Sequence, residues 1–288
     1  LNNVDYYGII NLYNKNIFNK KLTKLEEKMD IFLVIGLIGG SAVVLSGLLM
    51  KGASPSILFS GEAIMVIIVG SIIGILNSFP KNEVTKIPKI LGVLFSNKGR
   101  QDPVEIIEQL IEMSQRTRRD GLLSLEGTIQ GLDNRFMKKG LEMVVDGMES
   151  DIIKEVLEIE IESMEERHRL GATVFSTAGG TAPTLGVLGA VIGLIGALGN
   201  LNDIDKLGES ISSAFVATVY GIFCGYLIFH PFSNRLKRKS LEEIKNMNII
   251  LEGVLAIQAG NNPKSIERKL VGMLEPKDRI KLEKNSNN

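Results

Sequence analysis

Residues 179–200 read GGTAPTLGVLGAVIGLIGALGN, a run in which glycine recurs between large aliphatic side chains. Such a run has three ordinary explanations: a phosphate-binding loop, a flexible linker, or a helix that other helices must approach closely. A phosphate-binding loop would follow the pattern G-x-x-x-x-G-K-[ST], and this run contains no Lys or Arg. A flexible linker would not be filled with Val, Ile and Leu. The sequence therefore favours a closely packed helix.

Small residues are evenly spaced along this run. They follow one another at steps of four, three, four and three, which places them on one stripe of an α-helix. The stripe consists of Ala182, Gly186, Gly189, Gly193 and Gly196. The next apolar run has a matching stripe, which consists of Ala214, Thr218, Gly221 and Gly225. Because small residues let backbones pack closely in lipid, we expect a helix-packing seam on the inner wall of an oligomer, with room for a partner's helices.

Four apolar runs are long enough to cross a membrane as helices. About 20 residues of helix reach about 30 Å, the thickness of the hydrocarbon core. The first run contains no charged residue, and the second carries only Glu62, beside the turn that joins the two, where it can reach the headgroup layer. The runs are residues 31–50, 57–79, 174–200 and 211–232. With 44% hydrophobic residues and a positive mean hydropathy, the chain is predicted to be an all-α integral membrane protein with four transmembrane helices.

The rest of the sequence is rich in charge and predicts a large helical cytoplasmic domain between transmembrane helices 2 and 3. Asp102 suits a helix cap, Pro103 suits the first turn, and apolar residues then recur at helical spacing. A further helix is expected from about Ser150 to Arg169. We therefore divide the chain into an N-terminal extension over 1–28, expected to be non-native or disordered; an outer transmembrane hairpin over 29–79; a cytoplasmic helical domain over 80–172; an inner, pore-lining hairpin over 173–232; and a cytoplasmic C-terminal helix and tail over 233–288.

The distribution of basic residues predicts the orientation in the membrane. Residues 80–172 contain 14 Lys and Arg, and residues 233–288 contain 12. Each hairpin turn has only one, Lys51 or Lys206. Because cytoplasmic loops carry the excess of Lys and Arg, both termini and the 80–172 block are expected in the cytoplasm.

Composition argues against several classes of function. The formal net charge is zero, so the chain has no basic field to attract nucleic acid. Cys224 is the only cysteine, and His168 and His230 are far apart, which indicates neither a disulfide nor a metal site. Each histidine is expected to be an interfacial or surface residue. We expect no metal, no cofactor and no enzymatic activity.

The inner apolar runs contain hydroxyl groups but no Asp, Glu, Lys or Arg. Thr and Ser in membrane helices commonly bond to their own helix carbonyls. Pro183 removes one backbone hydrogen bond near the start of the third run and frees a carbonyl. If ions cross the membrane here, a partner chain must supply the carboxylate that carries them.

Three stretches of the sequence resemble the MotA family of flagellar stator subunits, within the wider MotA/TolQ/ExbB group. They are TAPTLGVLGAVIGLIGAL, AFVATVYGIFCGYLIFHP and RTRRDGLLSLEGTI. The resemblance implies five MotA-type chains around two MotB helices in the bacterial cytoplasmic (inner) membrane, with the ion bound by an Asp of MotB. It also implies that ion flow rotates the ring and that the cytoplasmic heads push on the rotor protein FliG.

The resemblance also implies roles for particular residues. Pro183 and Pro231 match the family's two prolines on the inner helices, Thr184 lies beside the first of them, and Thr218 matches the hydroxyl at the ion site. Arg118 and Glu126 match the charged pair that contacts the rotor. Sodium-driven relatives tend to have Thr where this chain has Ala190, so H⁺ is favoured and Na⁺ stays open. These ion-pathway and rotor-contact positions are Pro183, Thr184, Ala190, Thr218, Pro231, Arg118 and Glu126.

Two other functions stay open at this point. A TolQ- or ExbB-like energiser of outer-membrane processes would share the inner helices but usually has three spans. A stand-alone channel or transporter would normally carry its own intramembrane ionisable site, which the inner runs lack. The tight hairpin over 31–79 favours the stator subunit.

Overall fold

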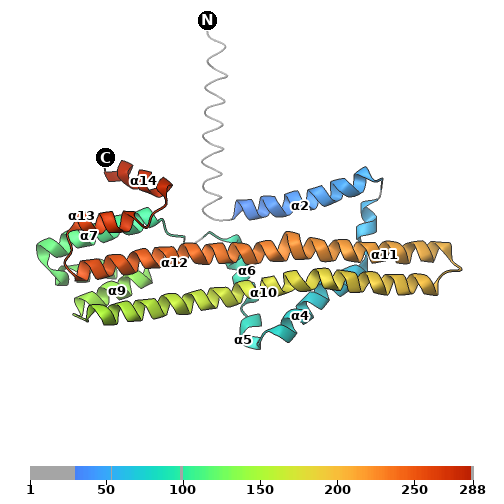
Figure 1. Cartoon of the computed structure of the whole chain (residues 1–288), viewed down its shortest axis with the longest axis horizontal. Helices are drawn as coiled ribbons and strands as arrows, with labels where there is room; N and C mark the ends of the chain where they lie inside the picture. The colour runs from blue at the N-terminus through green and yellow to red at the C-terminus, as the bar shows by residue number, and fades with distance from the viewer. Residues whose placement is uncertain (1–29, 53, 98–99, 287–288) are drawn as a thin grey trace, which may run out of the picture. The chain divides into compact units, whose positions relative to one another are not determined.

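The computed structural model describes residues 30–52, 54–97 and 100–286, and the expectation for residues 1–28 lies outside these ranges. In the described part of the chain, the regular elements are helices (Figure 1). Four of the helical segments are long and apolar enough to cross a membrane. They are Ile31–Met50, Pro55–Ser78, Ser150–Gly199 and Ile204–Gln258. The predicted all-α fold with four transmembrane helices is confirmed.

The chain forms two compact units. Among the described residues, unit 1 contains 30–52, 54–97 and 170–237, and unit 2 contains 100–169 and 238–286. The division differs from the expected segments in two places. Residues 81–95, expected in the cytoplasmic domain, belong to unit 1, which contains the membrane spans, and most of the expected C-terminal helix and tail belongs to unit 2, the soluble unit.

Unit 1 contains the apolar hairpins. α2 follows Asp30, whose carboxylate accepts a hydrogen bond from the Leu33 amide at 3.4 Å. Two segments of unit 1, η2 and η4, are π-helices, in which each turn takes up one more residue than in an α-helix. The elements are α2 (Ile31–Met50), η1 (Pro55–Leu58), α3 (Gly61–Ile64), η2 (Met65–Val69), α4 (Gly70–Ser78), α5 (Lys81–Val84), α6 (Ile87–Phe95), α11 (Ile204–Ile222) and η4 (Phe223–Phe229).

Helix α6 explains why residues 81–95 join the membrane unit. Its apolar residues recur at helical spacing, and Leu94 is fully buried with Ala172, Phe175 and Phe232. The Phe232 ring meets the Phe95 ring edge to face, with 5.6 Å between the ring centroids. The amphipathic pattern of α6 therefore packs against the inner helices.

Unit 2 contains the charged helices that were expected to be cytoplasmic. α7 begins as predicted, with Pro103 in its first turn and the Asp102 carboxylate accepting from the Val104 amide at 2.9 Å. It ends at Asp120, because Gly121 has a φ of 83°. The elements are α7 (Pro103–Asp120), η3 (Leu122–Leu125), α8 (Glu126–Gln130), α9 (Arg135–Val145), α13 (Pro263–Val271) and α14 (Pro276–Ser286).

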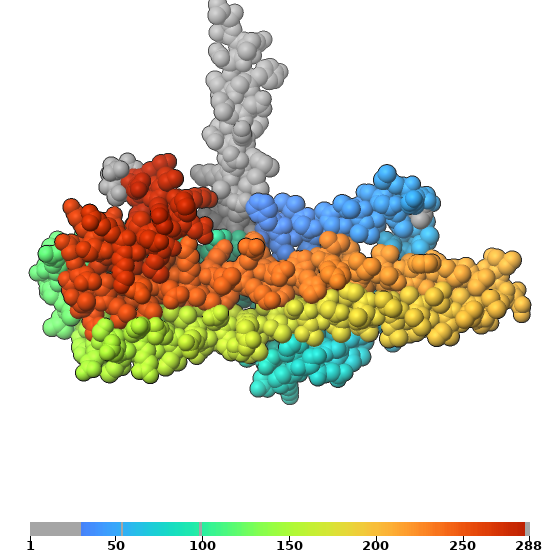
Figure 2. Space-filling model, viewed as in Figure 1, coloured from blue at the N-terminus to red at the C-terminus, as the bar shows by residue number. Residues whose placement is uncertain are grey.

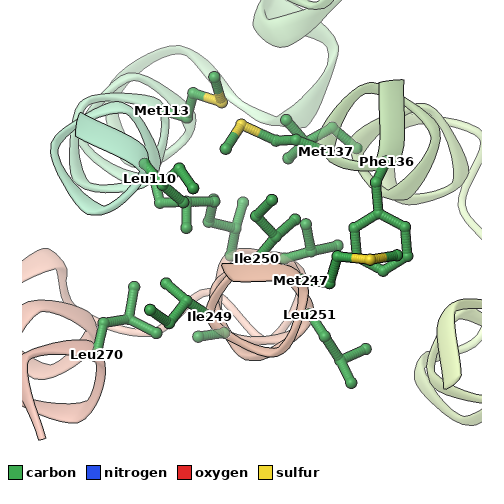
Figure 3. Close-up of a cluster of buried hydrophobic side chains, with 14 of the residues drawn as sticks. Leu110, Met113, Phe136, Met137, Met247, Ile249, Ile250, Leu251 and Leu270 are labelled. Carbon is green, nitrogen blue, oxygen red and sulfur yellow. The ribbon is translucent and has the colours of Figure 1, made fainter. Parts of the chain in front are cut away.

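The core of unit 2 is built from large side chains. Figure 3 shows side chains of α7, α9 and the neighbouring helices pointing toward one another, with Met113 facing Met137 and Met247 beside Phe136. Leu110, Met137 and Ile250 have no exposed surface. Ile249 and Leu270 show that residues beyond 238 complete this core. Most of the segment expected to be a C-terminal helix and tail is therefore an integral part of the soluble unit.

Two long helices run through both units. α10 spans Ser150–Gly199, and α12 spans His230–Gln258. The helix expected from Ser150 to Arg169 and the third transmembrane helix are thus one element. No Pro lies between residues 169 and 174, and Gly171 is part of the helix, so the backbone hydrogen bonds continue.

Candidate functional site

The helix-packing seam joins α10 to α11 within unit 1. A Cβ atom placed on Gly221 would lie 2.7 Å from the Ala182 carbonyl oxygen and 2.8 Å from the Gly186 Cα. A Cβ atom on Gly186 would lie 3.1 Å from the Ala217 carbonyl oxygen. These are backbone atoms, which cannot move aside as the end of a side chain can. The two backbones touch at this point. Figure 2 shows the yellow end of α10 and the orange α11 side by side.

Other glycines extend the seam away from this closest point. A Cβ atom on Gly189 would lie 2.8 Å from the Ala217 Cβ, and one on Gly193 would lie 2.8 Å from the Ala214 Cβ. Gly196 is different, because its nearest neighbour, the Ser210 hydroxyl, is at an ordinary 3.8 Å. Close contact therefore ends before Gly196.

The seam packs within the chain's own hairpin, which corrects one expectation. The small-residue stripe was expected to leave room for a partner's helices. Instead, the matching stripe of α11 fills that room. The surfaces left exposed on α10 and α11 carry large side chains, among them Leu188, Val191, Ile195, Phe215 and Ile222.

Pro183 lies opposite η4 in the same hairpin. It is inside α10 and has no N–H, so the carbonyl of Gly179 loses its helical partner. A Cβ atom on Gly225 would lie 2.8 Å from this carbonyl oxygen and 2.7 Å from the Pro183 Cγ. Pro231 lies in the first turn of α12, just beyond η4. The structure thus brings the two prolines to the same end of the inner hairpin.

The Thr184 and Thr218 hydroxyls bond to carbonyls of their own helices. The Thr184 hydroxyl donates to the Thr181 carbonyl at 2.7 Å, and the Thr218 hydroxyl donates to the Ala214 carbonyl at 3.3 Å. Thr184 is exposed, whereas Thr218 and Ala190 are half-buried. A threonine bonded in this way keeps lone pairs that can face an ion or water.

Glu62 lies at the opposite end of the hairpin from the prolines. Its carboxylate accepts from the Ser213 hydroxyl at 3.2 Å, and the Ser213 hydroxyl is 3.1 Å from that of Ser60. Nearby, the Tyr220 hydroxyl donates to the Leu58 carbonyl at 2.9 Å. These contacts tie the second span to α11, and Glu62 is an exposed residue at the first turn of α3.

The buried Asp30 and the half-buried Arg235 form an ion pair that the sequence did not reveal. Asp30 is 1% exposed, and the Arg235 guanidinium donates to both of its carboxylate oxygens, at 2.5 and 2.7 Å. Bidentate pairs of this kind are geometrically specific. The pair fixes the start of α2 to α12 within unit 1. The two residues are 205 positions apart, so no local pattern could have identified them.

Arg118 and Glu126 lie close to the end of α7 in unit 2. Arg118 is in the last turn of α7, and Glu126 begins α8. Both side chains are exposed, and neither forms an ion pair with a residue that the structure describes. The neighbouring Arg116 donates to the Thr128 hydroxyl at 2.7 Å. Because Gly121 interrupts the helix, the two charges do not share one helix face.

Metal coordination finds no support among the described residues, which contain no group of three or more His, Cys, Asp or Glu side chains placed to hold an ion. The hairpin can therefore shape and line a path, but its charge-free spans offer no resident ion ligand of the carboxylate type. A membrane carboxylate from elsewhere would have to complete such a site.

Known proteins share this arrangement over most of the chain. The sequence is 46% identical over 254 residues to motility protein A of Bacillus subtilis strain 168, which covers 88% of this chain and 94% of the relative. The chain belongs to the motility protein A (MotA) family. Residues 128–249 also match the model of the MotA/TolQ/ExbB proton channel family.

Solved MotA-family structures have the same fold. The flagellar MotAB stator complex of Bacillus subtilis matches with a TM-score of 0.82 at 46% identity, covering 86% of this chain and 97% of that one. C. jejuni MotAB matches with a TM-score of 0.82 at 33% identity and the same coverage. A MotA-family chain with four spanning helices is a multi-pass membrane protein.

Proposed function

We propose that this MotA-family chain is the larger subunit of a bacterial flagellar stator, which conducts ions across the cytoplasmic membrane together with a MotB-type partner and turns the motor. The observation that carries the proposal is the inner hairpin, whose two helices meet backbone to backbone and whose spans 174–200 and 211–232 contain no Asp, Glu, Lys or Arg. Pro183 leaves the Gly179 carbonyl of this hairpin without its helical hydrogen bond. Such a hairpin suits a channel wall that moves, with the ion ligand supplied by the partner's Asp. The proposed role is transport and torque rather than catalysis.

The finer assignments follow from the MotA family. Five copies would surround two MotB helices, with both termini of each copy in the cytoplasm. Arg118 and Glu126 would contact FliG, and their exposure without a partner in the described part of the chain supports this. Pro183, Thr184, Thr218 and Pro231 would line or gate the ion pathway. No cofactor or nucleic acid takes part.

H⁺ is the favoured ion. Ala190 presents a methyl group, which cannot coordinate Na⁺ because this hard cation prefers oxygen ligands. Na⁺ transport would then depend on Thr218 and backbone carbonyls. Swimming speed at fixed pH should therefore not change when the sodium concentration is varied, and a steep rise with sodium would reverse this assignment.

Complementation tests the function as a whole. A motile host that lacks its own stator genes should swim when it receives this chain with its MotB-type partner, and should stay paralysed with either gene alone. Rotation restored by this chain without any partner would favour a stand-alone channel. Restored outer-membrane energisation without motility would favour the TolQ/ExbB alternative.

The rotor contact has its own test. Arg118→Ala should slow swimming while Arg118→Glu combined with Glu126→Lys should stop it, because the reversed charges repel the rotor's complementary surface. Arg135→Glu, at an exposed charge on α9, is the matched control and should swim normally. Full swimming of the double reversal would exclude this surface as the rotor contact.

A further inference from the structure

The register of the hairpin changes at η4. From Gly193 to Gly179, the positions of α10 that face the seam meet Ala214, Ala217, Gly221, Gly225 and His230 in turn. The differences between these successive numbers are 3, 4, 4 and 5. Steps of three and four belong to an α-helix, and the step of five falls within the π-helix Phe223–Phe229. The extra residue rotates the chain so that His230, and not Phe229, reaches the seam.

The His230 ring occupies a place that only glycine can leave open. A Cβ atom on Gly179 would lie 2.9 Å from both the Cγ and the Nδ1 of the ring. By contrast, a Cβ atom on the next residue, Gly180, would meet nothing within 4 Å. Residue 179 must therefore be glycine because a side chain would clash with the His230 ring, and not because the helix itself needs glycine there. His230 is half-buried in this position.

The imidazole lies beside the point at which α10 lacks one backbone hydrogen bond. Gly179 is the residue whose carbonyl loses its hydrogen bond to Pro183, and π-helices and interrupted hydrogen bonds are typical of functional sites in membrane helices. The titratable neighbour of the ring is Tyr226, with 5.4 Å between ring centroids. No charged residue lies in α10 between residues 170 and 199.

The charges nearest in sequence lie further along α12. Arg235 is engaged by Asp30, and Lys237 is exposed. Histidine is the side chain that changes charge between about pH 5 and 8. In the two inner spans, which lack Asp, Glu, Lys and Arg, the His230 imidazole is the side chain of a type that commonly serves as a general acid or base. Its position at the proline end of the hairpin corresponds to the cytoplasmic end under the proposed orientation.

We propose that His230 is a proton-transfer residue at the cytoplasmic end of the ion pathway. The inference rests on the proposed function with H⁺ as the ion. A neutral ring nitrogen accepts the proton that water brings from the partner's carboxylic acid, which is left as a carboxylate. The imidazolium then gives a proton to cytoplasmic water and returns to the neutral base. Gly179 and the π-turn of η4 position the ring for this transfer.

The test measures single-motor rotation at low load, where ion transit limits speed, in the complemented strain with the complete stator. His230→Gln keeps a polar side chain that carries no proton, and Gly179→Ala displaces the ring without removing it. Gly180→Ala is the matched control on the adjacent residue. Internal and external pH are varied together, so that the gradient stays constant. Copurification with the partner verifies assembly, and His230→Asn replaces His230→Gln if the latter does not assemble.

We expect His230→Gln to slow rotation by about tenfold or more, because a positioned acid–base group typically contributes at least that much. Wild-type speed should fall as the pH decreases, since the protonated ring cannot accept, and the variant should lose this dependence. Gly179→Ala should behave in the same way, and Gly180→Ala should match the wild type. Wild-type speed and an unchanged pH profile in assembled His230→Gln or Gly179→Ala would overturn the inference. Failure of the wild-type chain to restore rotation would instead overturn the proposed function.

Discussion

The inner membrane hairpin and the core of the soluble unit are each stabilised internally, but by opposite kinds of packing. At the seam between α10 and α11, Gly186 and Gly221 bring two backbones into contact. In the core of unit 2, fully buried residues such as Leu110, Met137 and Ile250 fill the space between helices (Figure 3). The hairpin depends on glycines, which have no side chain, whereas the core of unit 2 depends on large buried side chains.

The solvent of each region explains the difference. Lipid tails are as apolar as Leu, so burying large side chains gains little in a membrane, and close packing of small residues takes over. In water, each buried apolar side chain contributes about 1.5–3 kcal/mol relative to an exposed one. The two regions should therefore respond to opposite kinds of substitution.

The largest expected effect is the loss of the hairpin in Gly221→Leu. The new side chain would start 2.7 Å from the Ala182 carbonyl, and two backbones cannot yield as a side-chain end can. We expect no copurification with the partner and no swimming. Gly47→Leu on α2, where a Cβ atom meets nothing within 4 Å, should assemble normally. Normal assembly of Gly221→Leu would show that the seam is not needed.

The corresponding experiment in unit 2 removes a large side chain. Leu110→Ala should lower the free energy of unfolding of the soluble unit by about 2–5 kcal/mol, the range for fully buried leucines. Pulse proteolysis of the purified complex in urea measures this quantity. Leu241→Ala, at a leucine that is 62% exposed, should change it by less than about 0.5 kcal/mol. Equal losses in the two variants would contradict a core of this kind.

A glycine inside the soluble core sharpens the comparison. A Cβ atom on Gly253 would lie 2.5 Å from a terminal methyl of Leu110, which is a movable group and not backbone. Gly253→Ala should therefore cost about 1–3 kcal/mol and leave the protein folded. Adding Leu110→Ala should cost less in this background than in the wild type, because the new methyl group occupies part of the cavity. Gly127→Ala, with open space around it, is the control, and strict additivity would count against the contact.

The smallest effect is expected at the start of α7. The Asp102 carboxylate caps the helix and accepts from the Lys281 ammonium of α14. Asp102→Ala should cost about 1 kcal/mol, as for other caps, whereas Asp102→Ser keeps the cap and removes only the ion pair. The same urea measurement separates the two contributions, and equal stability of both variants would assign the whole effect to the ion pair.

Asp102 should also make α14 sensitive to acid. Burial alone would raise the pKa of this carboxyl, but the Lys281 and Val104 hydrogen bonds and the charges of Lys281 and Arg100 outweigh it and lower the pKa. Its stabilisation is therefore present above the unfolded pKa of about 3.9 and is lost as the pH falls through the lower folded value. Cleavage of α14 by an acid-active protease such as pepsin should accelerate in that range in the wild type, and Asp102→Ser should remove the change.

Much of the fold could be predicted because its signals are local. Charge-free runs of sufficient length mark the spans, and Asp102 with Pro103 marks the start of α7. The boundaries of the units were harder, since they depend on which apolar face finds a partner. The pattern of Ile87, Ile90 and Leu94 was available in the sequence, but only the structure shows that it packs on the membrane hairpin.

The sequence indicated which residues belong to the candidate site but not how those residues are arranged. The small-residue stripes are visible in the sequence, yet spacing alone cannot say whether a stripe faces its own hairpin or another chain. The π-turn before His230 has no local signature, because it depends on contacts with Gly179 and Pro183. Asp30 and Arg235 pair across most of the chain, so neither residue shows its role by itself.

The close backbone contact at the seam restricts which single-base mutations the gene can tolerate. Every codon for glycine begins with GG, and any single-base missense change leads to Ala, Val, Ser, Cys, Asp, Glu, Arg or Trp, all of which carry a Cβ atom. At Gly186, Gly221 and Gly225, where a Cβ atom already meets backbone, no one-base missense change is harmless. At Gly180 and Gly199 the change to Ala meets open space. A map of missense variation in this gene should therefore show no changes at the first three codons and some at the other two.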